Sequence, residues 1–133
     1  MQEKIKVLMI EPTEHPKVSY IKPTMRAFRK AVKADDIEYG GVEAKKLEKR
    51  VYAIFNKDRF LVAGLEPNRK IDDDIIAGTM YIVATNDKSL PISLTSDQVS
   101  KYALQFWNIE TFDDIDVVEA NLNLMFSRLL KDE

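Results

Sequence analysis

The sequence contains no cysteine, a single histidine and only four glycines among its 133 residues. The absence of cysteine excludes disulfides, thiolate nucleophiles and thiolate zinc sites. A lone histidine, His15, lacks the partners that a transition-metal centre or a serine-histidine triad needs. There is also no glycine-rich phosphate-binding motif. These absences disfavour catalysis, and we expect a protein that is not an enzyme and that holds neither a cofactor nor a metal ion.

Long apolar runs are missing as well. No stretch approaches the ~18 apolar residues of a membrane span, and the start of the chain lacks the apolar core and cleavage site of a signal peptide. We therefore expect a cytoplasmic protein without membrane contact. Apolar residues still make up 45% of the chain, enough for a core. Its length indicates a single domain over residues 1–133.

Charge is distributed unevenly along the chain. Residues 1–70 contain 16 Lys and Arg against 10 Asp and Glu, whereas residues 71–133 contain 4 against 12. The acidic second half would repel a polyanion, so direct nucleic-acid binding is disfavoured. The same half could contact a basic groove on a protein that handles nucleic acid, or it could attract the basic half of its own fold. The candidate contact residues are Asp113, Asp114 and Asp116.

Periodicity predicts the elements of an α+β fold. Residues 4–10, 37–42, 51–55, 60–63 and 75–85 have the composition of strands, and residues 18–21 that of a short extended piece, whereas residues 45–50 resemble a charged connector. A helix follows Pro23, and two more close the chain. The expected order is strand, helix, four strands and two helices, with a mostly antiparallel sheet of four to five strands packed by helices.

The two C-terminal helices have recognisable starts. Thr95 and Gln98 have the spacing of a capping box, and Thr111 with Asp114 has a similar spacing before the last helix, in residues 111–133. That helix carries apolar residues at alternating intervals of three and four, as in a short coiled coil. They are Ile115, Val118, Leu122, Met125 and Leu129. Such a stripe either packs on its own sheet or pairs with a second copy in a homodimer.

A segment rich in glycine, proline and charge lies in the middle of the chain. Residues 64–69 are expected to form a loop, with Asn68 fixing a turn and Arg69 available to bind a carboxylate or phosphate beside Asp74. In the alternative interpretation, Arg69 pairs with Glu66 or with the carboxylates at 72–74 and locks the loop. The first interpretation predicts a small-ligand or nucleotide site, and the second a structural ion pair.

Several short motifs occur in a characteristic order: Glu11-Pro12, Ile37-Glu38, residues 52–56 ending in Asn56, residues 64–69 ending in Pro-Asn-Arg, residues 74–83 and residues 94–98. In this order they resemble the family of domain of unknown function 3846, over about residues 5–106. The basic residues at 45–50, residues 60–62 and the last helix depart from that pattern. The resemblance supplies no catalytic residue, and it implies an origin on phages, plasmids or conjugative elements.

Together these observations favour a non-catalytic binding or regulatory protein of a mobile genetic element that acts by binding a host protein. An anti-restriction or anti-CRISPR inhibitor would belong to this class. The alternatives are a small-ligand or nucleotide-binding domain that uses Asn68, Arg69 and Asp74, and a homodimeric assembly component.

Overall fold

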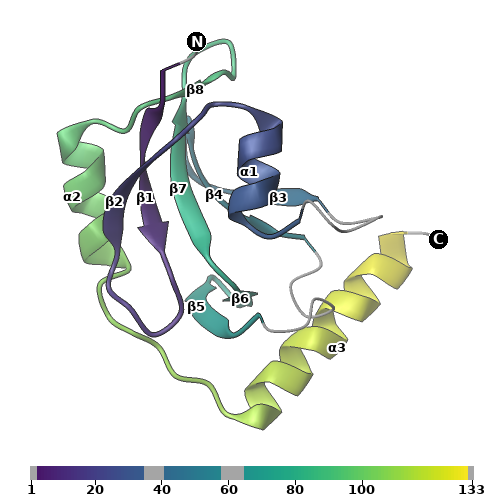
Figure 1. The fold of residues 1–133 in the computed structure, drawn as a ribbon. Coiled ribbons are helices and arrows are strands. Elements are labelled where there is room, and N and C mark those ends of the chain that lie inside the picture. Colours follow the sequence, from purple (N-terminus) through teal and green to yellow (C-terminus); the bar gives the residue numbers. More distant parts are fainter. Residues whose placement is uncertain (1–2, 35–40, 58–64, 132–133) are drawn as a thin grey trace.

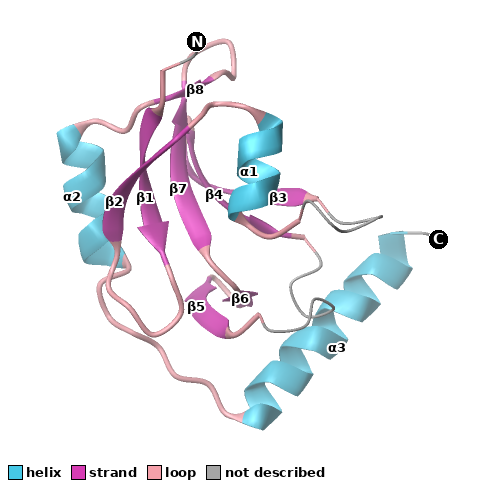
Figure 2. Cartoon of the chain, in the orientation of Figure 1, coloured by secondary structure: helices cyan, strands magenta, loops and turns pink. Residues whose placement is uncertain are grey.

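The computed structural model describes residues 3–34, 41–57 and 65–131. Within them the chain forms β1 (Ile5–Ile10), β2 (Lys17–Ile21), α1 (Met25–Ala31), β3 (Val42–Glu48), β4 (Val51–Asn56), β5 (Pro67–Ile71), β6 (Asp74–Ala77), β7 (Met80–Thr85), β8 (Pro91–Ile92), α2 (Ser96–Gln105) and α3 (Asp114–Lys131). The predicted α+β class is confirmed, with the helices set around one main sheet (Figure 2).

The main sheet is antiparallel throughout and has six strands in the described part of the chain, in the order β2-β1-β7-β4-β3, with β8 also paired to β7. It is therefore larger than the four to five strands expected. The apolar run at 75–85 is two strands, because the chain turns at Gly78, where φ is +80°. β6 pairs with β5 in a separate two-stranded sheet, whereas β7 lies at the centre of the main sheet.

Both faces of the main sheet are buried at its central strands β1, β7 and β4, and alternation along these strands makes this possible. In β7, Met80, Ile82 and Ala84 belong to the core on one face, and Tyr81 and Val83 to the core on the other. The first core includes Tyr102 and Phe106 from α2 and its C-terminal end, and the second includes Phe28 of α1. Figure 1 shows α1 and α2 on opposite sides of the sheet.

Helix α2 begins as its sequence predicts. The Thr95 hydroxyl accepts the Gln98 N–H at 3.1 Å, and the Gln98 side chain accepts the Thr95 N–H at 2.8 Å, which completes the capping box. At α3 the cap falls two residues later than expected. Asp113 Oδ1 accepts the Asp116 N–H at 2.8 Å, and Asp116 Oδ2 accepts the Asp113 N–H at 3.2 Å.

Three further expectations concern the basic half. Residues 45–50 are not a connector, because most of them belong to β3, which pairs with β4 at the sheet edge. The strand expected at 60–63 lies outside the described residues. So does most of the strand expected at 37–42, of which residue 42 begins β3.

Candidate functional site

Asn68 and Arg69 lie in strand β5 and not in a loop, and neither side chain is exposed to solvent. Neighbouring residues of a strand point to opposite faces, so both can be buried only where the strand is covered on both sides. The pairing register with β6 also shifts between Pro67 and Arg69. We call these two side chains the Asn-Arg node.

The guanidinium of Arg69 is held by three neutral acceptors. Its Nε donates to the Phe106 carbonyl at 3.1 Å, one terminal nitrogen donates to Asn68 Oδ1 at 2.9 Å, and the other donates to the Glu14 carbonyl at 2.7 Å. Burial lowers the pKa of Arg69, and the Glu110 carboxylate opposes this shift. An arginine remains charged in a protein even so. The charge is therefore solvated by backbone carbonyls of the β1–β2 loop and of the end of α2.

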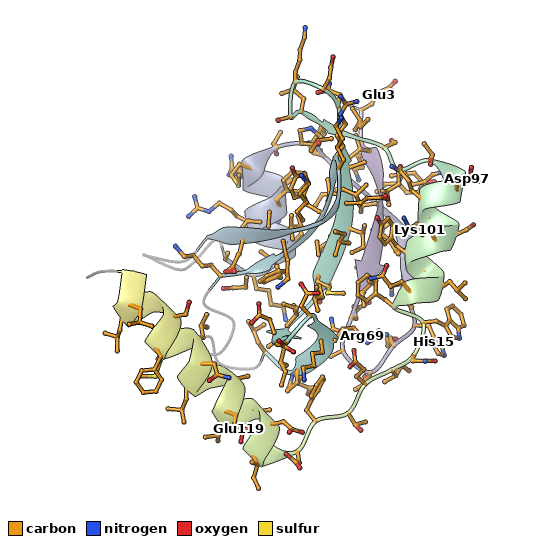
Figure 3. All side chains as sticks on the ribbon, turned by 180° about the vertical axis from the view of Figure 1, so that it is seen from behind. Glu3, His15, Arg69, Asp97, Lys101 and Glu119 are labelled. Atoms are coloured by element: carbon orange, nitrogen blue, oxygen red, sulfur yellow. The ribbon has the colours of Figure 1, made fainter. Side chains whose placement is uncertain are left out.

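Asn68 connects two further segments. Its amide nitrogen donates to the Ile10 carbonyl at 2.7 Å and to the Gly78 carbonyl at 2.9 Å. The end of β1 and the turn between β6 and β7 are thus fastened to β5 through one side chain. Figure 3 shows Arg69 in this part of the molecule, with His15 at the nearby end of α2.

The prediction that Arg69 pairs with Glu66 or with the carboxylates at 72–74 is wrong, because its hydrogen bonds go to other residues. Asp74 and Asp72 instead bind Lys45 of β3, at 2.9 and 3.4 Å. Partial burial lowers the pKa of Lys45, but these two carboxylates outweigh it and raise the pKa. The structure therefore brings Asn68 and Arg69 together and gives Asp74 a different role, which is to fasten the β5–β6 hairpin to the sheet edge.

A hollow of about 180 Å³ lies beside the node. Its walls are Glu11-Pro12 at the end of β1, Leu65-Glu66 before β5, Gly78-Thr79 between β6 and β7, and Lys33 after α1. Asn68 binds the carbonyls at the edges of two of these walls, Ile10 and Gly78. The node thus holds the hollow in shape without lining it.

The loop after β1 carries a feature that the sequence did not indicate. The exposed ring of His15 stacks on Trp107, with centroids 4.1 Å apart and planes 9° apart. The Nδ1 of His15 donates to the Trp107 carbonyl at 2.7 Å. These contacts tie the loop to the end of α2 next to the Glu14 carbonyl that Arg69 holds. No spacing signal in the sequence links residues 15 and 107.

The three candidate acidic residues meet at the start of α3. Asp113 and Asp116 are exposed, but each accepts the other's backbone N–H as a helix cap. Asp114 is the first residue of the helix. Asp113 and Asp116 therefore have a structural role at the N-terminus of α3, in addition to the acidic surface they were expected to form.

Helix α3 exposes most of its large apolar residues. Each is between 45% and 69% exposed: Ile115, Val118, Leu122, Met125, Phe126, Leu129 and Leu130. We call these seven side chains the α3 apolar face. Among the α3 residues whose burial is described, the partly buried ones are Val117, Ala120, Asn121 and Leu124. They share the opposite side of the helix because residues three and four apart lie on one face. Figure 1 shows α3 set apart from the two helices that cover the sheet.

No group of three or more histidine, aspartate or glutamate residues in the described ranges is arranged to hold a metal ion. Within those ranges there is also no helix with the length and apolar character that crossing a bilayer requires.

Several motif segments come together around the hollow within the α+β fold. The chain belongs to the family described as Domain of unknown function (DUF3846), whose model matches residues 5–107. Helix α3 lies outside that match. Comparison with curated proteins and with solved structures found no match.

Several motif segments of the resemblance are structural in this chain. Asn56 donates to the Val32 and Lys33 carbonyls at 3.2 and 3.1 Å and so holds the end of α1. Asn68 and Arg69 form the node, and Gly78 allows the turn between two sheets. These motif residues hold the fold together, and other residues of the same motif segments line the hollow.

Proposed function

We propose that this protein is a non-catalytic binding protein that acts through contact with another protein, and that α3 is its contact element. The observation that carries the proposal is the α3 apolar face, seven large side chains uncovered on one helix. Exposed apolar patches of this kind mark interaction surfaces in soluble proteins. The single histidine and the lack of cysteine support the non-catalytic part.

The face is directed away from the protein's own core. The side of α3 that carries Val117 and Leu124 is partly buried, whereas Leu122 and Phe126 on the other side are 45% and 60% exposed. Figure 3 shows side chains of α3 that project away from the sheet. The helix thus needs a partner to bury its larger apolar side.

Site-specific photo-crosslinking tests this proposal. A photoreactive amino acid replaces Phe126 in the full chain, and a matched control carries it at Tyr20, which is 57% exposed on β2. We expect crosslinks to a protein from position 126 and none from position 20. Equal crosslinking at the two positions, or none at position 126, would contradict the proposal.

A narrower form of the proposal names the setting. In this form the protein comes from a phage or plasmid and binds a host protein, as an anti-restriction or anti-CRISPR inhibitor would. Its support is the mobile-element origin that the family resemblance implies. The test is phage plating on cells with an active restriction or CRISPR system: expression of this chain should raise the plating efficiency, and an unchanged efficiency on both systems would reject this form.

A second candidate function, binding of a small ligand, is favoured by the hollow beside the Asn-Arg node. Glu11, Glu66 and Lys33 are among its lining residues, and Glu11 also pairs with Lys17 at 2.8 Å. Two acidic residues beside one lysine suit a small polar molecule with a cationic group. A thermal-shift screen with amino acids and polyamines would test it. A ligand bound there should raise the melting temperature of the natural chain and not of a Thr79→Trp variant, in which the hollow is filled.

A further inference from the structure

We propose that the α3 apolar face is covered by a second copy of this chain, in an antiparallel helix pair. This inference rests on the proposed function of α3 as a protein-contact element, and it names the partner. Three observations carry it: the spacing of the apolar residues, the charge along the helix and the size of the face.

The spacing fits a partner helix of the same kind. Ile115, Val118, Leu122, Met125 and Leu129 follow one another at intervals of three and four, which is the a and d pattern of two heptads. Residues in this pattern insert into the gaps of a helix that has the same repeat. A two-fold dimer supplies that repeat by symmetry, because the same patch is used on both copies.

The charge along α3 sets the direction. In the sequence of the helix, the acidic residues come in the first two turns and the basic residues in the last two. An antiparallel pair places the acidic start of one helix beside the basic end of the other, whereas a parallel pair would place like charges together. The antiparallel pair also places the positive end of each helix dipole beside the negative end of the other, which is favourable.

The size of the face is that of a small interface. Burial of a large apolar side chain removes roughly 60–120 Å² from water, from the ratio of its transfer energy to the energy per unit area. The seven side chains of each copy are about half exposed, so the fourteen side chains of a pair bury roughly 500–1,000 Å². This is at or below the roughly 1,000 Å² of a specific interface, and the dimer should therefore be weak and dissociate on dilution.

The first experiment is sedimentation velocity of the purified full chain over a range of concentrations. We expect a monomer–dimer equilibrium, and Leu122→Asp together with Leu129→Asp should raise its dissociation constant by at least about 100-fold. The matched control is Leu104→Asp, because Leu104 is a 79% exposed leucine on α2, and it should leave the equilibrium unchanged. Unfolding in urea checks that the sheet remains folded in every variant.

The lack of cysteine makes a second experiment possible, because any introduced cysteine is the only one in the chain. Under mild oxidation, Leu122→Cys should crosslink to itself, since it lies at the centre of an antiparallel pair. Ile115→Cys and Leu129→Cys should form a mixed disulfide with each other and little with themselves. Self-crosslinking of Ile115→Cys would overturn the antiparallel arrangement.

The failure of this inference differs from the failure of the proposed function. A chain that stays monomeric at every concentration, while position 126 crosslinks to a different protein, overturns the dimer and leaves α3 as a contact element. No crosslink of position 126 to any protein overturns both. A dimer that the two aspartates do not weaken would place the interface elsewhere and would reject the inference.

Discussion

The two sheets with α1 and α2, which we call the body, and helix α3 are both rich in apolar residues. The body buries most of these residues, whereas α3 leaves most of its large ones exposed. In the body, strand residues such as Val7 and Ile82 are fully buried on both faces of the sheet, and the buried polar side chains of Asn56, Asn68 and Arg69 donate to backbone carbonyls. In α3, Ile115 and Leu130 are each 69% exposed. The family match ends at residue 107, before this helix begins.

The difference shows which part of the chain is complete by itself. A buried polar group costs free energy unless it is hydrogen-bonded, and the hydrogen-bond partners of Asn68 and Arg69 meet that demand inside the body. In the part of the chain that the structure describes, the seven side chains of the α3 apolar face stay 45–69% exposed. We infer that the body is a folding unit and α3 an element that a partner completes. The following four predictions test this contrast, from the largest expected effect to the smallest.

Replacement of Arg69 should cause the greatest loss. Arg69→Met keeps an unbranched side chain but leaves the Phe106 and Glu14 carbonyls and Asn68 Oδ1 without their donors. Each buried acceptor left unpaired costs on the order of 1–3 kcal/mol, so the free energy of unfolding should fall by about 3 kcal/mol or more. Urea unfolding followed by circular dichroism and by the fluorescence of Trp107 measures it.

The matched control is the next residue, Lys70, which is exposed on the same strand. Lys70→Met should change the free energy of unfolding by no more than about 0.5 kcal/mol. A loss below about 1 kcal/mol for Arg69→Met would show that the node does not hold the body together, and it would make the buried arginine available again as a ligand group.

Gly78 tests the turn that separates the two sheets. Its φ of +80° is unfavourable for any other residue, and an added Cβ would lie 3.0 Å from Leu65 Cδ2. Gly78→Ala should therefore lower the free energy of unfolding by about 1–2 kcal/mol. Gly41 is the control, because an added Cβ there meets nothing within 4 Å. Denaturant unfolding of the two variants should differ, and equal stabilities would refute this account of the turn.

The helix caps compare the two regions directly. Thr95→Ala removes the capping hydroxyl of α2, which packs on the sheet, and should lower the stability of the body by about 1 kcal/mol. Asp113→Ala removes the matching cap of α3. It should reduce helix content by circular dichroism but leave the unfolding midpoint of the body where it is. An equal shift of that midpoint would mean that α3 belongs to the same cooperative unit.

Much of the body could be predicted from its sequence, for physical reasons. Alternation of apolar residues in β1 and β4 indicates strands, and the Thr95–Gln98 spacing fixes the start of α2, because these signals are local. The break at Gly78 was harder to predict, since residues 75–85 are apolar on both sides of it. Residues 45–50 were misjudged because an edge strand tolerates charge on its exposed face.

The candidate site was predicted less well because its contacts are long-range. The sequence indicates Asn68 and Arg69 as candidate residues of a loop, but they lie in β5 and their partners include carbonyls of residues 10, 14, 78 and 106. Any residue except its neighbours could supply a carbonyl, so no side-chain pattern reveals the pairing. The exposure of the α3 apolar face could likewise not be predicted, because the spacing of apolar residues reveals a stripe on a helix but not what covers it.

The smallest expected effect is a pH dependence at the contact between β3 and α2. The Tyr102 hydroxyl donates to Glu48, and Lys101 Nζ lies 3.2 Å from the same carboxylate. The hydrogen bond from Tyr102, and then Lys101, lowers the pKa of Glu48 below its ordinary 4.5. Burial, and then the bond to Glu48, raises the pKa of Tyr102 above its ordinary 10.0.

The two shifts have opposite signs, and together they define a pH window. A lowered carboxyl pKa stabilises the fold above about pH 4.5, and this contribution is lost as the pH falls through the folded-state pKa of Glu48. A raised tyrosine pKa stabilises the fold below about pH 10, and this contribution is lost as the pH rises further.

Glu48→Gln should therefore lower the free energy of unfolding between these limits and converge with the natural chain in acid. Tyr102→Phe, measured by urea unfolding from about pH 3 to 9, should lose most of the free energy of unfolding that Glu48→Gln loses. If the Glu48→Gln difference stayed constant down to acid pH, the carboxylate would not be titrating in contact with α2, and the β3–α2 contact would depend on apolar packing alone.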